Sequence, residues 1–368
     1  MTTSHETPLR TAVIGVGALG RHHARILSEM EGVDVIAVCD PNATQGAAVA
    51  EAAGTRYVAD YRQVLSEVDA ASVVVPTFLH RRVAEDCFAA GVHVMMEKPL
   101  AGTLDDGATI VAEARRAGLT LAVGHVERFN PAFEVLSEMV GTPRYIRAER
   151  LSPYAFRSTD ISAVHDLMIH DIELVQHLVR QAGDSSNVTR VDAMGTSLVG
   201  RLPDVIQARL HFESGCVADL TANRVSPGVS RTIQVWSDAG CVTADLQARE
   251  VTAHRPGPRL LAGELPLKCQ EAGEDVGSLK DAMFDSFFET VTPEVSGGDA
   301  LTAELAAFRD AVVSGIRPVV SGDDGLEALG VADRVVESVQ NHRWDRGGLS
   351  GPLAHPLLRP TAPLADAA

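Results

Sequence analysis

Two groups of residues in this chain have side chains suited to proton transfer. The first is Glu97-Lys98-Pro99, which follows an apolar run over 92–96 that is typical of a buried strand. A lysine taken out of water changes its basicity readily, so Lys98 could relay a proton at the strand end. The second is the pair Asp166 and His170, which share one face if their segment is helical. The imidazole could accept a proton from a substrate hydroxyl while the carboxylate orients the ring.

Each group also has a structural interpretation. A lysine before a proline is most often a solvated loop residue, and Asp166 with His170 could be a helix-start aspartate beside a partly buried histidine. A metal site is a third interpretation of the pair, because His165 and Asp171 are its neighbours in the sequence. Metal ligation needs at least three converging ligands, and on a helix these two neighbours point elsewhere, so we predict no metal.

A third group of residues is typical of dinucleotide binding. Gly15-Val16-Gly17-Ala18-Leu19-Gly20 has the spacing G-x-G-x-x-G and lies between a β-branched apolar run and a helical pattern. The first glycine permits a tight turn, the second lets the backbone approach a pyrophosphate, and the third lets the helix pack against the strand. The pyrophosphate would lie on the unpaired N–H groups where the helix begins. Alone, such a turn is weak support for a cofactor.

An acidic residue in the expected place strengthens this interpretation. Asp40 ends a second predicted strand over 33–39, roughly twenty residues after the last glycine. Its carboxylate can accept from a free ribose 2′-hydroxyl but repels a 2′-phosphate, which favours NAD over NADP. Pro41 follows it in place of an arginine that could hold a phosphate, although Arg21 near the glycine loop keeps both cofactors open. We predict NAD.

Alternating strands and helices position these residues in the first part of the chain. From Leu9 to Val123 the pattern predicts an α/β domain of the Rossmann type, a doubly wound parallel sheet, over 9–124. Ligands of such sheets bind beyond the carboxyl ends of the strands. The polar residues that follow these strands should therefore face one crevice; they are Thr77, His80, Glu97, Lys98, Gly124 and His125.

The rest of the chain has a different pattern. We predict an α+β domain over 125–342, with a large open, mostly antiparallel sheet and helices on one of its faces. Glycine and proline dominate after Arg346, so a loose tail is expected over 343–368. The predicted strands are 145–151, 192–199, 206–212, 217–222, 232–236, 241–246 and 251–254, and the predicted helices are 131–140, 163–181, 301–314 and 325–341.

Further polar side chains gather where the chain leaves the first domain. His125, Arg128 and Asn130 could bind a substrate, because ligands favour the boundaries between domains, or they could form a hydrogen-bonded hinge. His22 and His23 lie on the first predicted helix, and we interpret them as structural or exposed.

Composition argues against several classes of function. The net charge is −17 over 368 residues, whereas nucleic-acid binding needs clustered lysine and arginine. No apolar run reaches the roughly twenty residues that span a bilayer, and residues 1–8 lack the apolar core of a signal peptide. The five cysteines have no C-x-x-C spacing, which favours reduced thiols in a cytoplasmic protein. They are Cys39, Cys87, Cys216, Cys241 and Cys269.

Taken in order, these motifs resemble one family. The glycine loop, Pro76-Thr77-Phe78-Leu79-His80, Glu97-Lys98-Pro99 and the pair Asp166 and His170 are similar to the glucose–fructose oxidoreductase/inositol dehydrogenase/rhizopine-catabolism oxidoreductase family. The resemblance implies a Rossmann domain followed by an open-sheet domain that carries substrate and oligomer contacts. It also implies that Lys98, Asp166 and His170 are catalytic and that Thr77, His80 and Glu97 lie on the cofactor side.

Two stretches narrow the resemblance. Residues 123–131 and 166–172 are similar to the branch of the family that contains UDP-N-acetylglucosamine 3-dehydrogenases. This implies NAD-dependent oxidation of a secondary hydroxyl of a sugar or sugar nucleotide, with the 3-hydroxyl of UDP-N-acetylglucosamine as the candidate. The chain departs from its relatives at His165, where they usually have an apolar residue.

A sugar nucleotide would need positive side chains for its diphosphate, and Arg157, with Arg150 and Arg224, could supply them. Two other functions compete with this one. A free polyol or aldose dehydrogenase of the inositol dehydrogenase type needs no such arginines. A non-catalytic NAD-binding regulator is expected to lack the lysine or the histidine, whereas Lys98 and His170 are both present. Either of them could be the immediate base.

The predicted sheet of the second domain has too few helices to cover both of its faces. An uncovered apolar face is a natural subunit interface. The family resemblance also points to assembly through such sheets. We therefore predict a homo-oligomer, either a dimer or a tetramer.

Overall fold

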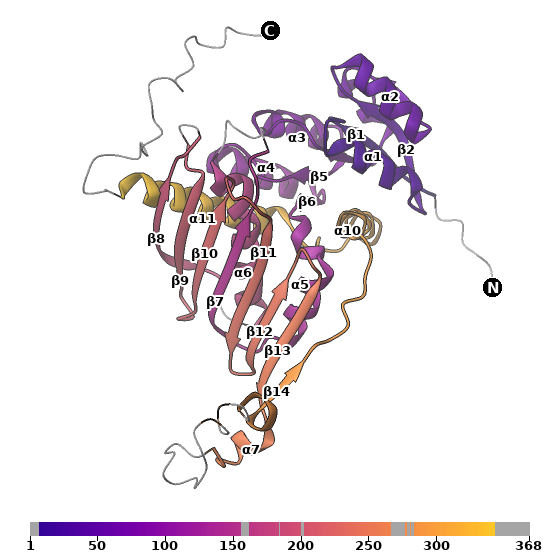
Figure 1. Cartoon of the computed structure of the whole chain (residues 1–368). Coiled ribbons are helices and arrows are strands. Elements are labelled where there is room, and N and C mark those ends of the chain that lie inside the picture. The colour runs from indigo at the N-terminus through magenta and orange to yellow at the C-terminus, as the bar shows by residue number, and fades with distance from the viewer. Residues whose placement is uncertain are drawn as a thin grey trace, which may run out of the picture. The chain divides into compact units, whose positions relative to one another are not determined.

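The computed structural model divides the chain into two compact units (Figure 1). The first comprises Met1–Asn130 with Gly297–Gly330, and the second comprises Pro131–Ser296 with Val331–Ala368. Arg157, Cys269 and the tail predicted over 343–368 lie outside the described residues. Those that the structure describes are 7–155, 162–183, 185–199, 202–265, 277, 280 and 283–342.

The first unit is built on a parallel sheet with the strand order β3-β2-β1-β4-β5-β6. This is the strand order of a Rossmann fold, in which the sheet reverses its winding between β1 and β4. The predicted doubly wound parallel sheet is confirmed. Its strands are β1 (Leu9–Ile14), β2 (Val33–Cys39), β3 (Arg56–Val58), β4 (Ala70–Val73), β5 (His93–Glu97) and β6 (Leu121–Gly124).

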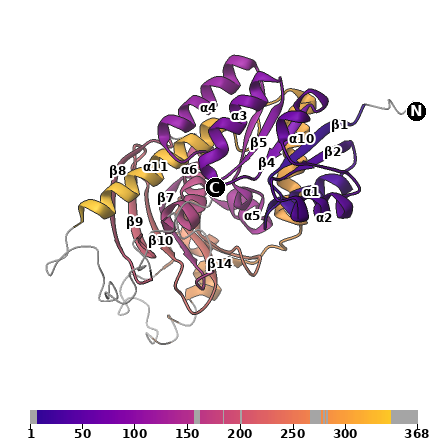
Figure 2. The same ribbon diagram turned by 90° about the horizontal axis from the view of Figure 1, so that it is seen from above.

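Helices cover both faces of this sheet (Figure 2). Apolar side chains of α3 and α4 are buried in one cluster, and those of α1, α2 and α10 are buried in another. These two clusters form the core of the unit. The helices are α1 (Gly20–Glu29), α2 (Ala43–Ala53), α3 (His80–Ala89), α4 (Leu104–Ala117) and α10 (Ala300–Ser314).

The segment 297–330 belongs to the first unit, whereas the sequence assigned it to the second domain. Leu305 and Phe308 of α10 are buried with side chains of the first sheet and its helices, and Ser321 forms a backbone bridge with Ala122 of β6. An amphipathic pattern shows which face of a helix is apolar but not which sheet that face covers. The pattern therefore predicted α10 but not its partner.

The second unit contains a larger sheet with the order β14-β13-β12-β11-β7-β10-β9-β8. Only β7 and β10 pair in parallel, so the mostly antiparallel sheet is confirmed. Strand β14 lies in a stretch for which the sequence predicted no element. The strands are β7 (Pro143–Leu151), β8 (Val188–Thr196), β9 (Val205–Phe212), β10 (Val217–Asn223), β11 (Ser230–Ser237), β12 (Gly240–Asp245), β13 (Glu250–Pro256) and β14 (Phe288–Val291).

Alternate side chains of this sheet are buried on one face only. Ala218, Leu220 and Ala222 of β10 are fully buried, while the residues between them are partly exposed. The buried face packs against α5 (Pro131–Met139) and α6 (Ile169–Gln181). Helix α7 (Pro258–Leu261) follows β13, and α11 (Gly322–Asn341) begins in the first unit and ends in the second. Among the described residues, no helix combines the length and apolar character needed to cross a membrane.

Candidate functional site

The three glycines after β1 have different surroundings, and each fits one role in cofactor binding. Gly15 has a φ of +86°, and a Cβ there would lie 2.4 Å from the Val74 carbonyl oxygen. A Cβ on Gly20 would lie 1.9 Å from the Gly15 carbonyl oxygen, so α1 can begin here only with glycine. A Cβ on Gly17 would meet only the Gln45 side chain, at 3.9 Å. The second glycine therefore leaves open the space that a pyrophosphate would occupy.

The start of α1 is suited to an anion. No side chain caps its first turn, and that turn contains no acidic residue. The backbone N–H groups and the positive end of the helix dipole therefore have no negative side chain in competition with a ligand. Leu19, just before the helix, is 45% exposed. For Ala18 and Leu19, binding of the cofactor through backbone N–H groups stays a prediction.

Asp40 lies beyond the carboxyl end of β2 and is fixed from two sides. Its Oδ2 accepts from the Val16 backbone N–H at 2.9 Å, and its Oδ1 accepts from the Asn42 N–H at 2.8 Å. The first of these bonds ties the carboxylate to the glycine loop. A carboxylate oxygen has a second lone pair, so both remain able to accept from ribose hydroxyls.

A cavity of about 370 Å³ adjoins this carboxylate. It lies beyond the carboxyl ends of β1, β2 and β3, where a doubly wound sheet binds its ligand. Apolar side chains that include Val75, Ile14 of β1 and Val83 of α3 line part of it, and its charged lining residues are two aspartates and two arginines. The lining residues are Ile14, Gly15, Cys39, Asp40, Pro41, Ala59, Asp60, Tyr61, Arg62, Val75, Leu79, Arg82 and Val83. The residues present therefore fit the adenosine half of NAD.

Thr77 and His80 occur together after β4, but they differ in exposure. Thr77 is in a partly exposed 3₁₀ turn, whereas His80 is only 1% exposed. The His80 Nε2 lies 3.0 Å from the Val75 carbonyl oxygen and its Nδ1 lies 3.2 Å from that of Leu100. Burial lowers the pKa of this imidazole against the opposing effect of both carbonyls. His80 thus joins the loops that follow β4 and β5, and its place on the cofactor side stays a prediction.

Lys98 follows directly after β5, and His125 follows directly after the neighbouring strand β6. Glu97 and Gly124 are partners in the register of these strands, so the two residues emerge side by side. Burial, with the nearby positive charges of Lys98 and Arg128, lowers the pKa of His125 to about 3. The imidazole is therefore neutral near pH 7 and adds no positive charge beside the lysine.

The turn after His125 is buried in the first unit. Arg128 and Asn130 are 7% and 8% exposed, and the Asn130 side-chain amide donates to Glu127 Oε2 at 3.1 Å. Helix α10 packs against this turn. Such burial fits the hinge interpretation of His125, Arg128 and Asn130, and their contact with a substrate stays a prediction.

Asp166 and His170 lie in the second unit. The predicted helix over 163–181 begins with a π-helical turn at Val164–Met168, and α6 starts at Ile169. Asp166 therefore lies in the wider turn and His170 in the regular helix, and both are partly exposed. A single π turn at a helix start is frequent at functional sites. The π turn contains one more residue than an α-helical turn, and a prediction based only on helical spacing does not detect this.

The two neighbours of this pair are engaged elsewhere, as the helical interpretation predicted. His165 Nε2 lies 2.9 Å from Asp333 Oδ1 of α11. Asp171 is 4% exposed and accepts from the Arg150 guanidinium, with its shortest contact at 2.7 Å. No group of three metal-ligating side chains is present among the residues that the structure describes.

Two of the arginines considered for a diphosphate are buried in ion pairs. Arg150 is 3% exposed beside Asp171, and Arg224 is 5% exposed beside Asp204, at 2.8 Å. Removing either guanidinium would leave a buried carboxylate without its charge partner, so these pairs are part of the fold of the second unit. Both arginines are therefore poor candidates for binding a diphosphate.

Sequence reasoning did not find one contact near the candidate site. His23 was interpreted as structural or exposed, and it is structural: it is 1% exposed and lies 3.2 Å from Glu97. The spacing of Gly20, His23, Ala24 and Leu27 repeats at three and four residues, which is the pattern of a buried helix face. That pattern was the available signal.

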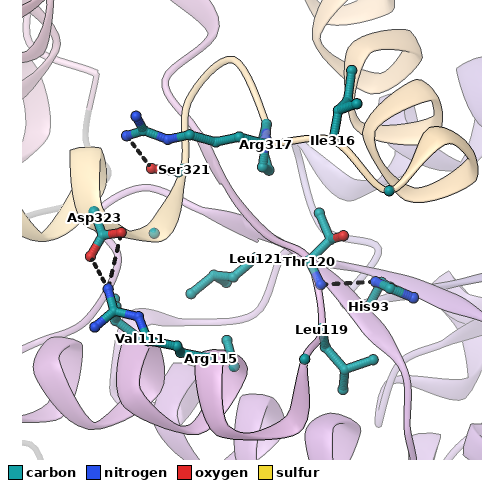
Figure 3. A pocket seen from close by; sticks show the side chains of 15 residues that line it. His93, Val111, Arg115, Leu119, Thr120, Leu121, Ile316, Arg317, Ser321 and Asp323 are labelled. Atoms are coloured by element: carbon teal, nitrogen blue, oxygen red, sulfur yellow. Dashed lines mark hydrogen bonds and ion pairs between the residues drawn. The ribbon is translucent and has the colours of Figure 1, made fainter.

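The first unit has a second cavity, drawn in Figure 3, where strands β5 and β6 begin. It has a volume of about 360 Å³ and is lined by the start of β6 and by the segment 315–323. Its arginines are engaged, because Arg115 pairs with Asp323 and Arg317 bonds to Ser321. The amino ends of the strands are not where such sheets bind cofactors, so this cavity is separate from the site.

The glycine loop, the carboxylate after β2 and the lysine after β5 define a dinucleotide-dependent oxidoreductase with a Rossmann fold. The profile of the oxidoreductase family with an NAD-binding Rossmann fold matches residues 9–125, and that of the GFO/IDH/MocA C-terminal domain matches 132–243. The chain therefore belongs to the GFO/IDH/MocA family of NAD-binding oxidoreductases. The family expected from the motifs is confirmed.

Several relatives resemble this chain over nearly its whole length. The UDP-N-acetylglucosamine 3-dehydrogenase of Acidithiobacillus ferrooxidans is 33% identical over 90% of this chain and 97% of its own. A solved structure of that enzyme has a TM-score of 0.77 and 30% identity, and the match covers 91% of this chain and 98% of that one. The scyllo-inositol 2-dehydrogenase (NAD(+)) of Bacillus subtilis is 27% identical over 91% of this chain and 95% of its own.

Proposed function

We propose that this protein oxidises a secondary hydroxyl of a sugar nucleotide with NAD, and that the group oxidised is the 3-hydroxyl of UDP-N-acetylglucosamine. The observation that carries the proposal is the position of Lys98 at the same edge of the sheet as the glycine loop and Asp40. The substrate is supported by the relative that is 33% identical over 90% of the chain. NAD rather than NADP is supported by Asp40, whose charge opposes a 2′-phosphate.

In this proposal the catalytic groups are Lys98, Asp166 and His170. His170 accepts the proton of the sugar hydroxyl, and Asp166 orients the imidazole. Lys98 donates a hydrogen bond to the same oxygen, and the neutral His125 adds no second positive charge beside the lysine. When bound, the nicotinamide supplies the hydride acceptor. In this scheme either Lys98 or His170 could take the proton first.

The test is NADH formation, followed by its absorbance, with a panel of substrates. The panel contains UDP-N-acetylglucosamine, other UDP-sugars, free N-acetylglucosamine and the inositols. We expect the highest kcat/KM with UDP-N-acetylglucosamine. Substrate that carries deuterium at carbon 3 should pass the label to the nicotinamide, and substrate labelled at carbon 4 should not. Absence of turnover with every member of the panel would refute the proposal.

A free polyol is the second candidate substrate, and one observation favours it. The Arg150 and Arg224 side chains, which could have bound a diphosphate, are paired with buried aspartates. A relative named as an inositol 2-dehydrogenase is 27% identical to this chain. Higher kcat/KM with an inositol than with any UDP-sugar would establish this alternative.

We also propose that the protein is a cytoplasmic homo-oligomer. The four described cysteines are free thiols, and three of them, Cys39, Cys87 and Cys216, are buried, which suits a reducing compartment. Assembly is supported by the second face of the large sheet, where Tyr145 and Trp236 pack with ring centroids 5.1 Å apart and stay partly exposed. That face is more polar than the sequence suggested, because Asp219 there binds both Arg209 and Tyr145.

A further inference from the structure

Three polar side chains from separate elements meet in the interior of the first unit. His23 of α1 has its Nδ1 2.8 Å from the Ser72 hydroxyl of β4. Its Nε2 lies 3.2 Å from Oε1 of Glu97, the last residue of β5. His23 and Ser72 are 1% and 2% exposed, so both are shielded from water. The histidine therefore connects the middle of the sheet to the residue that precedes Lys98.

The contacts of Glu97 determine which of its two carboxylate oxygens faces His23. The Lys98 backbone N–H donates to Glu97 Oε2 at 3.1 Å, which leaves Oε1 facing His23. Nε2 lies within ion-pair distance of Oε1 but makes no hydrogen bond to it, so the histidine holds this carboxylate by close contact rather than by a directed bond. On the other side of the ring, the Ser72 hydroxyl can donate to Nδ1, which lies 2.8 Å away.

Steric contact restricts Glu97 from the other side. A Cβ on Gly124 would lie 3.2 Å from both Cδ and Oε2 of Glu97, so the carboxylate already packs against the backbone of β6. With the histidine on one side and this backbone on the other, the Glu97 side chain has little freedom. Because Glu97 accepts from the Lys98 N–H, the backbone of the lysine is held with it.

The order serine, histidine, carboxylate is also that of a hydrolase triad, and burial excludes this function. Ser72 lies inside β4 and is 2% exposed, so no substrate carbonyl could approach its hydroxyl. A nucleophilic serine must be reachable by the group it attacks. The three side chains can therefore only support one another and the residue next to them.

We propose that His23 is a positioning residue that fixes Glu97, and through it Lys98, beyond the end of β5. This rests on the proposed function, in which Lys98 contacts the reacting oxygen. A displacement of about 1 Å in a catalytic group lowers turnover by roughly 10²-fold, so a buried brace one residue away has a measurable effect.

The test compares His23→Leu with His23→Gln. Leucine fills the space without polar atoms, whereas the glutamine amide can still donate toward Glu97. We expect His23→Leu to weaken NADH binding, measured by nicotinamide fluorescence, and to lower kcat, each about tenfold, because Glu97 and the backbone of Lys98 lose a close polar contact and shift by a fraction of an ångström. The KM for the sugar should change little, and His23→Gln should recover most of both losses.

His93→Leu is the matched control. His93 is on the same strand as Glu97 but at its opposite end, where its Nδ1 accepts from the Thr120 N–H at 2.9 Å. This variant loses a partly buried histidine hydrogen bond of the same strand and should keep wild-type kcat and NADH affinity. If His23→Leu does not fold, Ser72→Ala removes the donor to Nδ1 and should weaken NADH binding to a smaller extent.

A double-mutant cycle on NADH binding separates this inference from the proposed function. If His23 acts through Glu97, His23→Leu adds nothing to the loss caused by Glu97→Ala, which removes the carboxylate that His23 contacts. The positioning role would be refuted if the losses of NADH affinity were additive in the double variant. It would also be refuted if His23→Leu and His23→Gln lost the same affinity, or if His23→Leu kept the affinity of the wild type. Failure of the wild type on the whole substrate panel would refute the proposed function alone, because the cycle needs no substrate.

Discussion

Asp40 is the residue that should decide between the two nicotinamide cofactors. Its carboxylate is tied to the glycine loop through the Val16 N–H, so it cannot turn away from a 2′-phosphate. We expect NAD⁺ to bind more tightly than NADP⁺, and Asp40→Ala to narrow that difference. The variant should lose about 10- to 100-fold in NAD⁺ affinity, the value of hydrogen bonds to a charged group. Calorimetric titration with both cofactors measures this, and a wild type that prefers NADP⁺ would refute it.

Lys98 and His170 should be separable from cofactor binding. We expect Lys98→Ala and His170→Ala to lower kcat by about 10²–10⁴, the usual contribution of acid–base catalysis, while NAD⁺ still binds. Asp166→Asn should be milder, because its proposed role is to orient the imidazole. Lys280→Ala, at an exposed lysine, is the control and should match the wild type. Near-normal turnover in both alanine variants would show that the catalytic groups are elsewhere.

His125 should make the stability of the protein depend on pH. Its pKa is about 3 in the folded state, lowered by burial and by Lys98 and Arg128, against about 6.5 when unfolded. As the pH falls, the unfolded chain binds a proton at His125 before the folded protein does. The contribution of the neutral His125 to the free energy of unfolding is therefore fully present above pH 6.5 and is lost as the pH falls toward 3. The loss is about 2 kcal/mol between pH 7.5 and pH 5.

The measurement is the free energy of unfolding of the wild type and of His125→Gln at both pH values. The variant should be less stable at pH 7.5 but should lose about 2 kcal/mol less than the wild type on acidification. His22→Gln changes an exposed histidine and is the control. If the wild type and His125→Gln lost the same free energy of unfolding on acidification, the lowered pKa of His125 would be contradicted.

At the scale of elements, two glycines of the loop between β1 and α1 should respond differently to substitution by alanine. Gly20→Ala places a Cβ 1.9 Å from the Gly15 carbonyl oxygen, so α1 cannot dock and the melting temperature should fall by several degrees. Gly17→Ala meets only the Gln45 side chain, so the protein should keep its melting temperature. It should nevertheless bind NADH at least tenfold more weakly, because the methyl group occupies the space of the pyrophosphate.

Gly102→Ala is the control for this pair, since a Cβ there would have open space around it. It should change neither the melting temperature nor the affinity for NADH. If Gly17→Ala bound NADH normally, the open space above Gly17 would not be the pyrophosphate site. Differential scanning calorimetry and nicotinamide fluorescence provide the two measurements.

The same elements show which features can be predicted from sequence. The spacing of the glycines and the position of Asp40 depend on local geometry, because one turn and one strand length determine them. The sequence therefore predicted the glycine turn and the strand that ends before Asp40, and the structure contains both; their binding of NAD stays a prediction. The brace at His23 depends on contacts with Ser72 and Glu97, which are 49 and 74 positions away, and periodicity shows only that His23 faces inward. A long-range partner has no local signal.

Helix starts show a related difference. The pattern over 163–181 predicted a helix, and a helix is present, but it opens with the π turn at Val164–Met168. One extra residue in a turn leaves the apolar pattern almost unchanged, while it alters how Asp166 is presented relative to His170. A prediction based on period alone therefore finds the element and misses the local geometry that matters for chemistry.

At the scale of the whole molecule, the division into units is not a simple cut in the sequence. The first unit ends at Asn130 but regains Gly297–Gly330, so its folding requires residues made long after the sheet. A fragment over 1–130 would expose the face that α10 covers through Leu305 and Phe308. We expect this fragment to aggregate or to remain unfolded by circular dichroism, and a chimera of 1–130 linked to 297–330 to fold.

The large sheet of the second unit makes a prediction about assembly. Tyr145 of β7 and Trp236 of β11 pack against each other on its partly exposed face, and tryptophan and tyrosine are frequent anchors of interfaces. We expect light scattering at micromolar concentration to give a multiple of the 39.0 kDa chain mass.

Trp236→Asp would place a charge in the proposed interface between copies of this sheet and should yield monomers with an unchanged circular dichroism spectrum. Val313→Asp changes an exposed apolar side chain of α10 instead and should leave the mass unchanged. A wild type with the monomer mass would contradict the proposed assembly, and an oligomer that survives Trp236→Asp would place its interface on another surface.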